Sequence, residues 1–319
     1  MKILVTGAAG FLGSRLIHSL LAGAPGFPRV SAVIAADTGR SPVDDPRVDC
    51  RIGTIVDRGF IDSLLDADVR IVYHLAAVLS GQSEAEFDTG MRVNVDGTRG
   101  LLEACRARGT APRFVFSSTV AVFGGALPPV VPETLALRPQ TSYGVGKAIA
   151  ELLVGEYSRR GFIDGVACRL ATVTVRPGKP NSALSSFVSG VIREPLAGIE
   201  AVCPVPLDTP IWVSSPRTVT ANLLHAGSMD TAALGDNRAV NLPGISVSAG
   251  DLLASLERVA GPEVRARVRV ERDDRVARAM SGWPAVLDTT RALSLGFAAD
   301  ASVDGIVREY VAELGTKGF

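Results

Sequence analysis

The chain has 319 residues, of which 47% are hydrophobic and 21% are charged, enough to bury a sizeable core in one large domain or two closely joined ones. Thirty-three basic residues balance thirty-three acidic ones, so no overall field attracts nucleic acid or an anionic membrane. The expected function class is small-molecule chemistry, with no nucleic-acid partner and no membrane partner.

The few cysteines and histidines are scattered along the chain. They are Cys50, Cys105, Cys168, Cys203, His18, His74 and His225. No Cys-x-x-Cys pair and no ligand spacing occurs, so we expect reduced, buried thiols and no metal site. The apolar run after Lys2 stops at Gly7, too early for a secretion signal, which favours the cytoplasm.

In the first half of the chain, short apolar runs alternate with longer amphipathic segments. The predicted strands are Lys2–Val5, Val30–Ala35, Ile71–Leu75, Phe114–Phe116 and Val166–Leu170. Each is too continuously apolar to have a solvated face, as expected for a parallel sheet covered on both sides. The predicted helices between them are Phe11–Leu21, Ala85–Ala107 and Tyr143–Arg160. This order predicts an α/β, doubly wound, Rossmann-type parallel sheet.

After about Val175 the alternation weakens, and proline and glycine interrupt the chain. Helices are predicted at Ala183–Ile192, Pro216–Gly227 and Ala249–Val259. We expect residues 1–175 to form a dinucleotide-binding domain, with a segment near 208–245 returning to it. Residues 176–319 are expected to form a smaller C-terminal substrate-binding lobe.

A glycine loop links the first predicted strand to the first predicted helix. Gly7 permits the tight turn, Gly10 lets the backbone approach a pyrophosphate, and Gly13 lets the helix pack closely on the sheet. The N–H groups of the helix N-terminus then bind the phosphates. The same spacing also occurs in ordinary strand-to-helix turns, but the strand before it and the helix after it favour a dinucleotide site.

Asp37 ends the second predicted strand. A carboxylate there accepts hydrogen bonds from the ribose hydroxyls and repels a 2′-phosphate, so NAD is the expected cofactor. Arg40 lies nearby and leaves NADP open as the alternative.

Tyr143 and Lys147 are four residues apart, which places a phenol and an ammonium one turn apart on one face of a helix. A free phenol titrates near pH 10, so it needs a nearby cation to act as a base. We expect Lys147 to lower its pKa and Thr119, after the strand Phe114–Phe116, to hold the reacting oxygen. A lone Tyr-x-x-x-Lys is usually a surface pair, but this one lies where ligands bind in open α/β folds.

The chain resembles the extended short-chain dehydrogenase/reductase family in five motifs. They are T-G-A-A-G-F-L-G at 6–13, H-L-A-A at 74–77, N-V-D-G-T at 94–98, F-S-S-T-V-A-V-F-G at 116–124 and Y-G-V-G-K at 143–147. The resemblance implies that Tyr143 is the acid/base, that Lys147 binds the nicotinamide ribose, and that Thr119 orients substrate. It also implies a homodimer through the helices 85–107 and 143–160.

The expected cofactor contacts extend along the same motifs. They are Gly7, Gly10, Phe11, Leu12, Gly13, Asp37, Thr54, Ile55, Leu75, Ala76, Ala77, Asn94, Tyr143, Lys147, Ala171 and Val173. The family often has Gly-Asp near the adenine, whereas this chain has Gly53-Thr54. We therefore expect Thr54 and the backbone of Ile55 to contact the adenine in place of the aspartate.

Segments 169–187, 192–198 and 213–226 look like those of the D-erythronate dehydrogenase branch, once grouped with nucleotide-sugar epimerases. This resemblance implies NAD-dependent oxidation of the 2-hydroxyl of a sugar acid. The expected substrate contacts are Ser80, Thr119, Tyr143, Thr172, Arg176, Asn181, Ser185 and Arg217. Each polar residue of the second lobe also has a structural alternative, such as a helix cap.

Two other functions stay open. A nucleotide-sugar 4-epimerase would use the same base with tightly held NAD, but it needs a long cleft. The second lobe is poor in aromatic residues, with Trp212 and Phe187 the main ones, which argues mildly against such a cleft. A non-enzymatic dinucleotide-binding sensor would tolerate loss of the base, and the intact Tyr143 and Lys147 argue against it.

Overall fold

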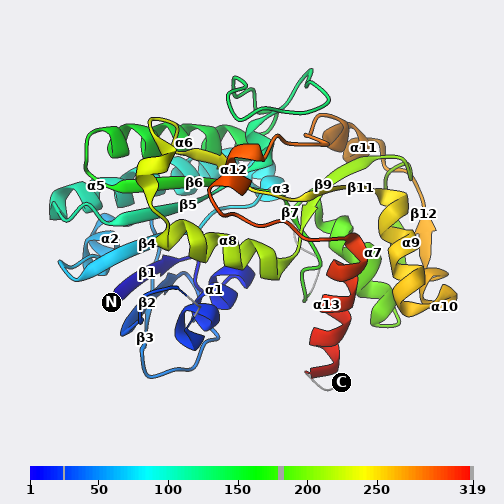
Figure 1. Ribbon diagram of the computed structural model, residues 1–319, viewed down its shortest axis with the longest axis horizontal. Helices are drawn as coiled ribbons and strands as arrows, with labels where there is room; N and C mark the ends of the chain where they lie inside the picture. The colour runs from blue at the N-terminus through cyan, green and yellow to red at the C-terminus, as the bar shows by residue number, and fades with distance from the viewer. Residues whose placement is uncertain (24–25, 179–182, 317–319) are drawn as a thin grey trace.

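A seven-stranded parallel sheet runs through the computed structural model, which describes residues 1–23, 26–178 and 183–316. The strand order is β10–β6–β5–β4–β1–β2–β3 (Figure 1). Its strands are β1 (Lys2–Thr6), β2 (Ala32–Asp37), β3 (Val48–Ile52), β4 (Val69–His74), β5 (Arg113–Thr119), β6 (Asp164–Leu170) and β10 (Ala239–Asn241). The predicted doubly wound α/β fold is confirmed.

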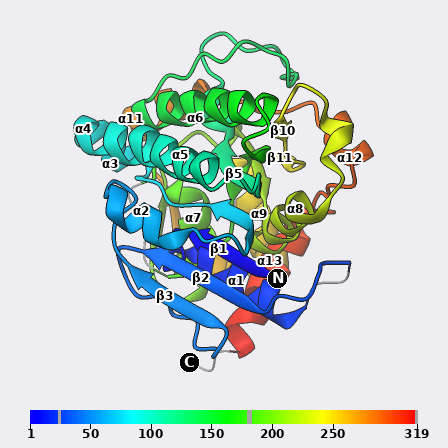
Figure 2. The same ribbon diagram turned by 90° about the vertical axis from the view of Figure 1, so that its left-hand side faces the viewer.

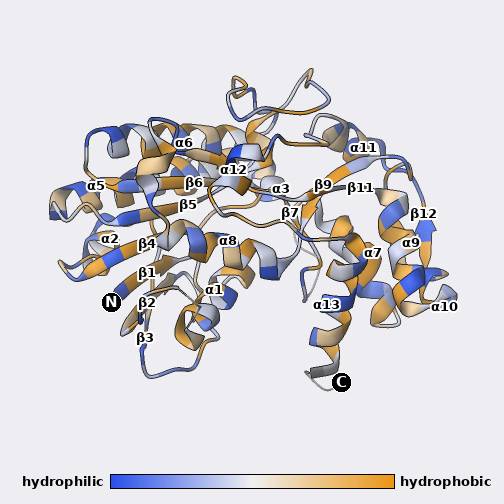
Figure 3. Cartoon of the chain, viewed as in Figure 1, coloured by the Kyte–Doolittle hydropathy of each residue, from blue (hydrophilic) through white to orange (hydrophobic). Residues whose placement is uncertain are grey.

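Helices cover both faces of this sheet (Figure 2). One face carries α2 (Arg58–Leu64), α5 (Thr98–Arg108) and α6 (Ser142–Arg159), and the other carries α1 (Phe11–Ala22) and α8 (Pro216–Ser228). Neighbouring residues of one strand serve opposite faces, since Leu4 packs with the first group and Ile3 with the second. The inner strands β1 and β2 therefore read as largely apolar runs, and Figure 3 colours the molecule by hydropathy.

The order of the strands reverses beside β1. From β1 the chain moves outward through β2 to the edge strand β3, then returns to β4 on the other side of β1. Adjacent crossovers leave in opposite directions there, and a crevice opens at the carboxyl ends of the strands. The loop that carries Gly7, Gly10 and Gly13 lies at this point.

A second group of elements has its own hydrophobic cluster, which includes Val191, Ile211, Leu252 and Val307. It contains the sheet of β7 (Thr172–Val173), β9 (Pro210–Ser214) and β11 (Ile245–Ser248), and the pair β8 (Ala201–Cys203) and β12 (Val268–Val270). Its helices are α7 (Ser186–Leu196), α9 (Ala249–Ala260), α10 (Pro262–Arg265), α11 (Asp274–Ser281) and α13 (Val303–Thr316). We call this group the second lobe and the sheet with its helices the first lobe.

The two lobes interlock along the chain. Three elements come later in the chain than the first second-lobe strands but pack in the first lobe. They are the helix α8, the strand β10 and the helix α12 (Thr290–Ser294). A domain boundary at residue 175 therefore remains a proposal.

The segment predicted as one helix at Ala85–Ala107 is interrupted in the structure. It forms α3 (Ser80–Ala85), α4 (Phe87–Met91) and a π-helical turn (Arg92–Gly97) before α5, and Glu86, with φ −128° and ψ 69°, separates the first two. The edge strand β3 was not predicted, because its sequence V-D-C-R-I is polar and mostly solvent-exposed. The helix α7 begins later than the predicted Ala183.

The cysteines are all free, with Cys50 half-buried and the other three buried. Within the three described ranges, no helix combines the length and the apolar character that crossing a bilayer requires.

Candidate active site

The glycine loop brings backbone atoms unusually close together. Gly7 has φ +75°, which favours glycine, and a Cβ atom on it would lie 2.7 Å from the amide nitrogen of Ala76. A Cβ atom on Gly13 would lie 2.1 Å from the carbonyl oxygen of Gly7. No side chain caps the N-terminus of α1 at Gly10, so its first N–H groups stay available to a phosphate.

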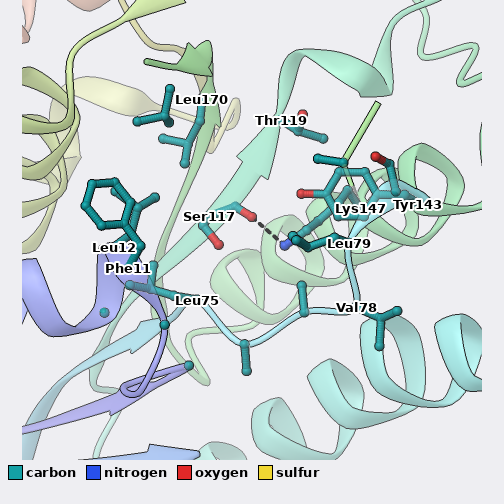
Figure 4. A pocket seen from close by; sticks show the side chains of 18 of the residues that line it. Phe11, Leu12, Leu75, Val78, Leu79, Ser117, Thr119, Tyr143, Lys147 and Leu170 are labelled. Carbon is teal, nitrogen blue, oxygen red and sulfur yellow. Dashed lines mark hydrogen bonds between the residues drawn. The ribbon is translucent and has the colours of Figure 1, made fainter. Parts of the chain in front are cut away.

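A cavity of about 590 Å³ extends from this loop to the second lobe. The expected site residues that line it are Gly7, Gly10, Phe11, Leu12, Gly13, Asp37, Thr54, Ile55, Leu75, Ala76, Ala77, Ser80, Thr119, Tyr143, Lys147, Ala171, Thr172, Val173, Arg176 and Ser185. Figure 4 shows Phe11 and Leu12 on one side of it, across from Thr119, Tyr143 and Lys147. The topology thus brings together side chains that are far apart in sequence.

Asp37 lies at one end of the cavity, at the end of β2. Its carboxylate accepts hydrogen bonds from the backbone N–H of Ala9 at 2.9 Å and of Gly39 at 3.3 Å. These bonds fix a negative group beside the glycine loop, where a ribose diol is attracted and a 2′-phosphate is repelled. Thr54 lines the same end, with its hydroxyl accepting from the N–H of Val56 at 3.3 Å.

The helix α6 and the strand β5 present the polar groups at the middle of the cavity. Thr141 caps α6 by accepting from the N–H of Gly144 at 3.1 Å, which starts the helix just before Tyr143. Lys147 follows one turn later, with its Nζ 5.7 Å from the centre of the Tyr143 ring. That ammonium donates to the carbonyl of Ser117 at 2.7 Å (Figure 4). Thr119 ends β5, and its hydroxyl accepts from the N–H of Ala121 at 3.2 Å.

Burial dominates the electrostatics of this pair. It raises the pKa of Tyr143 to about 12 and lowers the pKa of Lys147 to about 7. The sequence predicts that Lys147 lowers the pKa of the phenol, whereas the positive charge that does so in the structure is that of Arg176. Burial outweighs the effect of Arg176, so the pKa of the phenol is raised overall.

A buried ion pair, missed by the sequence reasoning, lies behind Lys147. Glu151 is one further turn along α6 and accepts from Arg169 of β6 at 2.8 Å, with both side chains at most 5% exposed. The hydroxyl of Ser118 also donates to Glu151, which ties α6 to the end of β5. An arginine inside the otherwise apolar run V-A-C-R-L was the available signal, because a buried charge requires a partner.

Arg176 is the charged group of the second lobe that lines the cavity. Burial and the nearby Arg193 lower its pKa, Tyr143 acts in the opposite direction, and no carboxylate of the described ranges pairs with it. Arg193 donates to the backbone carbonyl of Arg176 at 2.8 Å, which fixes the chain there. A desolvated guanidinium in this setting is complementary to a carboxylate.

Two predicted contacts lie outside the lining of the cavity, and a third is not among the described residues. Asn94 lies behind the cavity wall, where its amide bonds the N–H of Val78 at 2.8 Å and the carbonyl of Val78 at 3.0 Å. It supports the lining from behind and is not part of it. Arg217 is 72% exposed, pairs with Glu309 and lies outside the lining, which leaves it no part in the substrate site. Asn181 falls outside the described residues.

The cavity also contains an aromatic residue that the sequence reasoning did not consider, Trp283. Trp212, named there as a main aromatic of the second lobe, is 6% exposed and packs in a buried cluster with Val120 and Phe123. The clefts of a fold depend on where connecting segments cross, and periodicity along the chain does not show this.

Comparison with known proteins agrees with this geometry. The family described as the NAD dependent epimerase/dehydratase family matches residues 3–208. A D-erythronate dehydrogenase of Cupriavidus necator is 49% identical over 324 residues, 99% of each chain, and one of Haemophilus influenzae is 40% identical over 98% of this chain and 99% of that one.

Among solved structures, a nucleoside-diphosphate-sugar epimerase from Agrobacterium tumefaciens has a TM-score of 0.94 and 40% identity, and the match covers 99% of this chain and 95% of that one. The residues present fit a bound NAD, because the glycine loop gives the close approach that a pyrophosphate needs and Asp37 faces the place of its ribose. The chain therefore belongs to the NAD dependent epimerase/dehydratase family, as an NAD-dependent dehydrogenase of the extended short-chain dehydrogenase/reductase type.

Proposed function

We propose that this enzyme oxidises the 2-hydroxyl of a short sugar acid, D-erythronate, to the 2-oxo acid. The observation that carries the proposal is the Arg176 guanidinium, which lines the same cavity as Tyr143 without an acidic partner among the described residues. A substrate carboxylate bound there would complete the charge balance. Two relatives of nearly equal length named D-erythronate dehydrogenase support this choice.

The side chains divide the work between proton transfer and positioning. Tyr143, as phenolate, takes the proton of the substrate hydroxyl, and Thr119 orients that hydroxyl. Lys147, held against the carbonyl of Ser117, binds the nicotinamide ribose, and Arg176 is the cation whose charge favours the phenolate. When bound, NAD would supply the hydride acceptor for the carbon that bears this hydroxyl.

The proposal is tested by the absorbance of NADH formed from NAD and D-erythronate. Tyr143→Phe should bind NAD normally and lower kcat by about 10²- to 10⁴-fold, the usual contribution of general acid–base catalysis. Tyr157→Phe is the matched control, because Tyr157 lies on the same helix, bonds Glu103 and does not line the cavity. Unchanged turnover of Tyr143→Phe would refute the role of the phenol.

The resemblance to the epimerase from Agrobacterium tumefaciens keeps a nucleotide-sugar 4-epimerase as the second candidate. An epimerase returns the hydride to its substrate and gives no net NADH, whereas a dehydrogenase accumulates it. The same assay with a nucleotide sugar separates the two, and a protein that only senses dinucleotide gives no product in either case.

We also propose that the enzyme is a homodimer through the region of α4 and α6. Phe87, Val145 and Leu152 are 58%, 37% and 70% exposed there, which is unusual for large apolar side chains on neighbouring helices. Leu152→Glu should shift the molar mass measured by light scattering from that of a dimer to that of a monomer. The four free thiols fit the reducing cytoplasm.

A further inference from the structure

Trp283 lines the cavity from the second lobe, and neither the motifs nor the proposed chemistry accounts for it. It lies just beyond α11, where the indole also packs against the hydrophobic cluster of the second lobe. An indole offers a large, stiff apolar surface with one N–H donor. Such a group in the wall of a substrate cavity limits the space that is left for the substrate.

The segment that carries Trp283 passes from one lobe to the other. We call residues 283–288 the strap. Before it, Met280 is 3% exposed in the second-lobe cluster, and within it Leu287 is 3% exposed in another cluster, with Val131, Ala148 of α6 and Trp212 of β9. Buried side chains therefore hold the strap on both sides of Trp283.

Backbone hydrogen bonds hold it as well. The N–H of Val131 donates to Val286 at 2.9 Å, and the N–H of Asp288 donates to Val131 at 2.9 Å. The amide of Asn241 donates to the carbonyl of Asp288 at 3.2 Å, and the N–H of Trp283 donates to Met280 at 3.1 Å. With both ends fixed, the indole has little freedom to move out of the cavity wall.

The second-lobe side of the cavity begins with Thr172 and Val173 of β7. Among the described residues after β7, four more line it: Arg176, Ala183, Ser185 and Trp283. One is a cation, one is a large aromatic, and the other two are small. A ligand anchored by an anion at Arg176 would share this part of the cavity with the small residues and the indole.

We propose that Trp283 is a specificity residue that forms the end wall of the substrate space and limits the chain length of the acid that the enzyme oxidises. The inference rests on the proposed oxidation of a short hydroxy acid. A longer aldonate would place its additional carbons and hydroxyls against the apolar indole face, which cannot satisfy them.

Fluorescence tests the position of Trp283 without relying on turnover. The chain has two tryptophans, so Trp212→Phe leaves Trp283 as the only one, and Trp283→Phe leaves Trp212. With saturating NADH present, D-erythronate binds without reacting. Its titration should change the emission of Trp212→Phe saturably and leave the emission of Trp283→Phe flat, because Trp212 does not line the cavity.

Chain-length selectivity tests the role. Trp283→Ala should raise the ratio of kcat/KM for the six-carbon D-gluconate to that for D-erythronate by at least about tenfold, since a single methylene in a fitted pocket is worth about 10- to 200-fold. Trp283→Leu keeps an apolar wall of smaller size and should give an intermediate ratio, which also guards against poor folding of the alanine variant.

The outcomes separate this inference from the proposed function. If Trp212→Phe forms NADH from D-erythronate but its emission does not respond, or if both single-tryptophan variants respond equally, Trp283 is not at the substrate. An unchanged selectivity ratio in both Trp283→Ala and Trp283→Leu would also overturn the inference. If wild type forms no NADH from D-erythronate, the proposed function itself fails.

Discussion

The two walls of the cavity recognise their ligands by different means. The first-lobe wall consists largely of backbone and small residues, such as Gly7, Gly13 and Ala76, held in place by the parallel sheet. The second-lobe wall includes the side chains of Thr172, Arg176, Ser185 and Trp283. Because the first wall is largely backbone, its shape suits one cofactor and changes little with sequence. Because the second wall is made of side chains, a few substitutions there can change which substrate the enzyme accepts.

The two walls also differ in whether the charged side chains behind them are paired. Behind the first wall, Arg169 and Glu151 form a closed pair, so no net charge from them faces the cavity. Behind the second wall, Arg193 pairs with Glu194 and leaves Arg176 without an acidic partner in the described ranges. An anion is therefore attracted to the second-lobe end of the cavity.

The largest effect is expected from filling space in the backbone wall. Gly13→Ala places a methyl group on the carbonyl of Gly7, and the resulting shift of α1 should weaken NAD binding at least about 100-fold, which corresponds to about 3 kcal/mol. Calorimetric titration with NAD measures it.

Gly155→Ala is the matched control in α6, where a Cβ atom would meet no heavy atom within 4 Å. Since alanine favours a helix over glycine, this variant should bind NAD normally and be more stable by about 0.5–1 kcal/mol. Equal NAD affinity in both variants would mean that close backbone approach is not what the first wall provides.

In the second wall, we expect the loss of a charge to have a larger effect than a change of shape. Arg176→Leu removes a charged hydrogen-bond partner worth about 1.5–3 kcal/mol, so KM for the acid should rise about 10- to 100-fold while NAD affinity stays unchanged. The charge of Arg176 also lowers the pKa of Tyr143, so the rising limb of kcat/KM against pH should move to higher pH.

Arg176→Lys separates these two effects. It keeps the positive charge, so the pH profile should stay near that of wild type. It loses the planar fork that binds a carboxylate through two hydrogen bonds, so KM should still rise. If Arg176→Leu changed the affinity for NAD and not the KM for the acid, Arg176 would belong to the cofactor site.

The same contrast explains what the sequence predicts well. Gly7, Gly13, Asp37 and the pair Tyr143 and Lys147 lie at fixed places relative to strands with strong apolar patterns, so local spacing is enough to bring them to one edge of the sheet. The α/β fold follows from the same patterns. These features depend on short-range periodicity and on the topology of parallel sheets.

The substrate side is less predictable for a physical reason. Arg176 and Trp283 reach the cavity through irregular segments whose path is set by tertiary contacts, such as the pairing of Val131 with the strap. Arg217 looked similar to Arg176 in sequence, but it lies on the solvent side of α8 and pairs with Glu309. No spacing rule distinguishes two arginines of this kind.

The smallest expected effect is on stability and concerns the one titratable amine that the first wall buries among the described residues, that of Lys147. Burial lowers its pKa from 10.5 to about 7, so between these values the unfolded chain holds a proton that the folded chain does not. Raising the pH in this window therefore favours the folded state. From about pH 7 to about pH 9 the free energy of unfolding of wild type should rise relative to Lys147→Met by about 2 kcal/mol.

Urea unfolding of both proteins at each pH measures this difference, and groups that titrate in both proteins cancel from it. Lys2→Met is the control, because Lys2 lies outside the cavity and pairs with Asp66 at a partly exposed site. Its difference from wild type should stay constant over the same range. A constant difference for Lys147→Met as well would mean that the amine remains hydrated. In that case Lys147 would, like Arg176, present a lasting positive charge to the cavity, and the contrast between an uncharged amine in the first wall and a cation in the second would be lost.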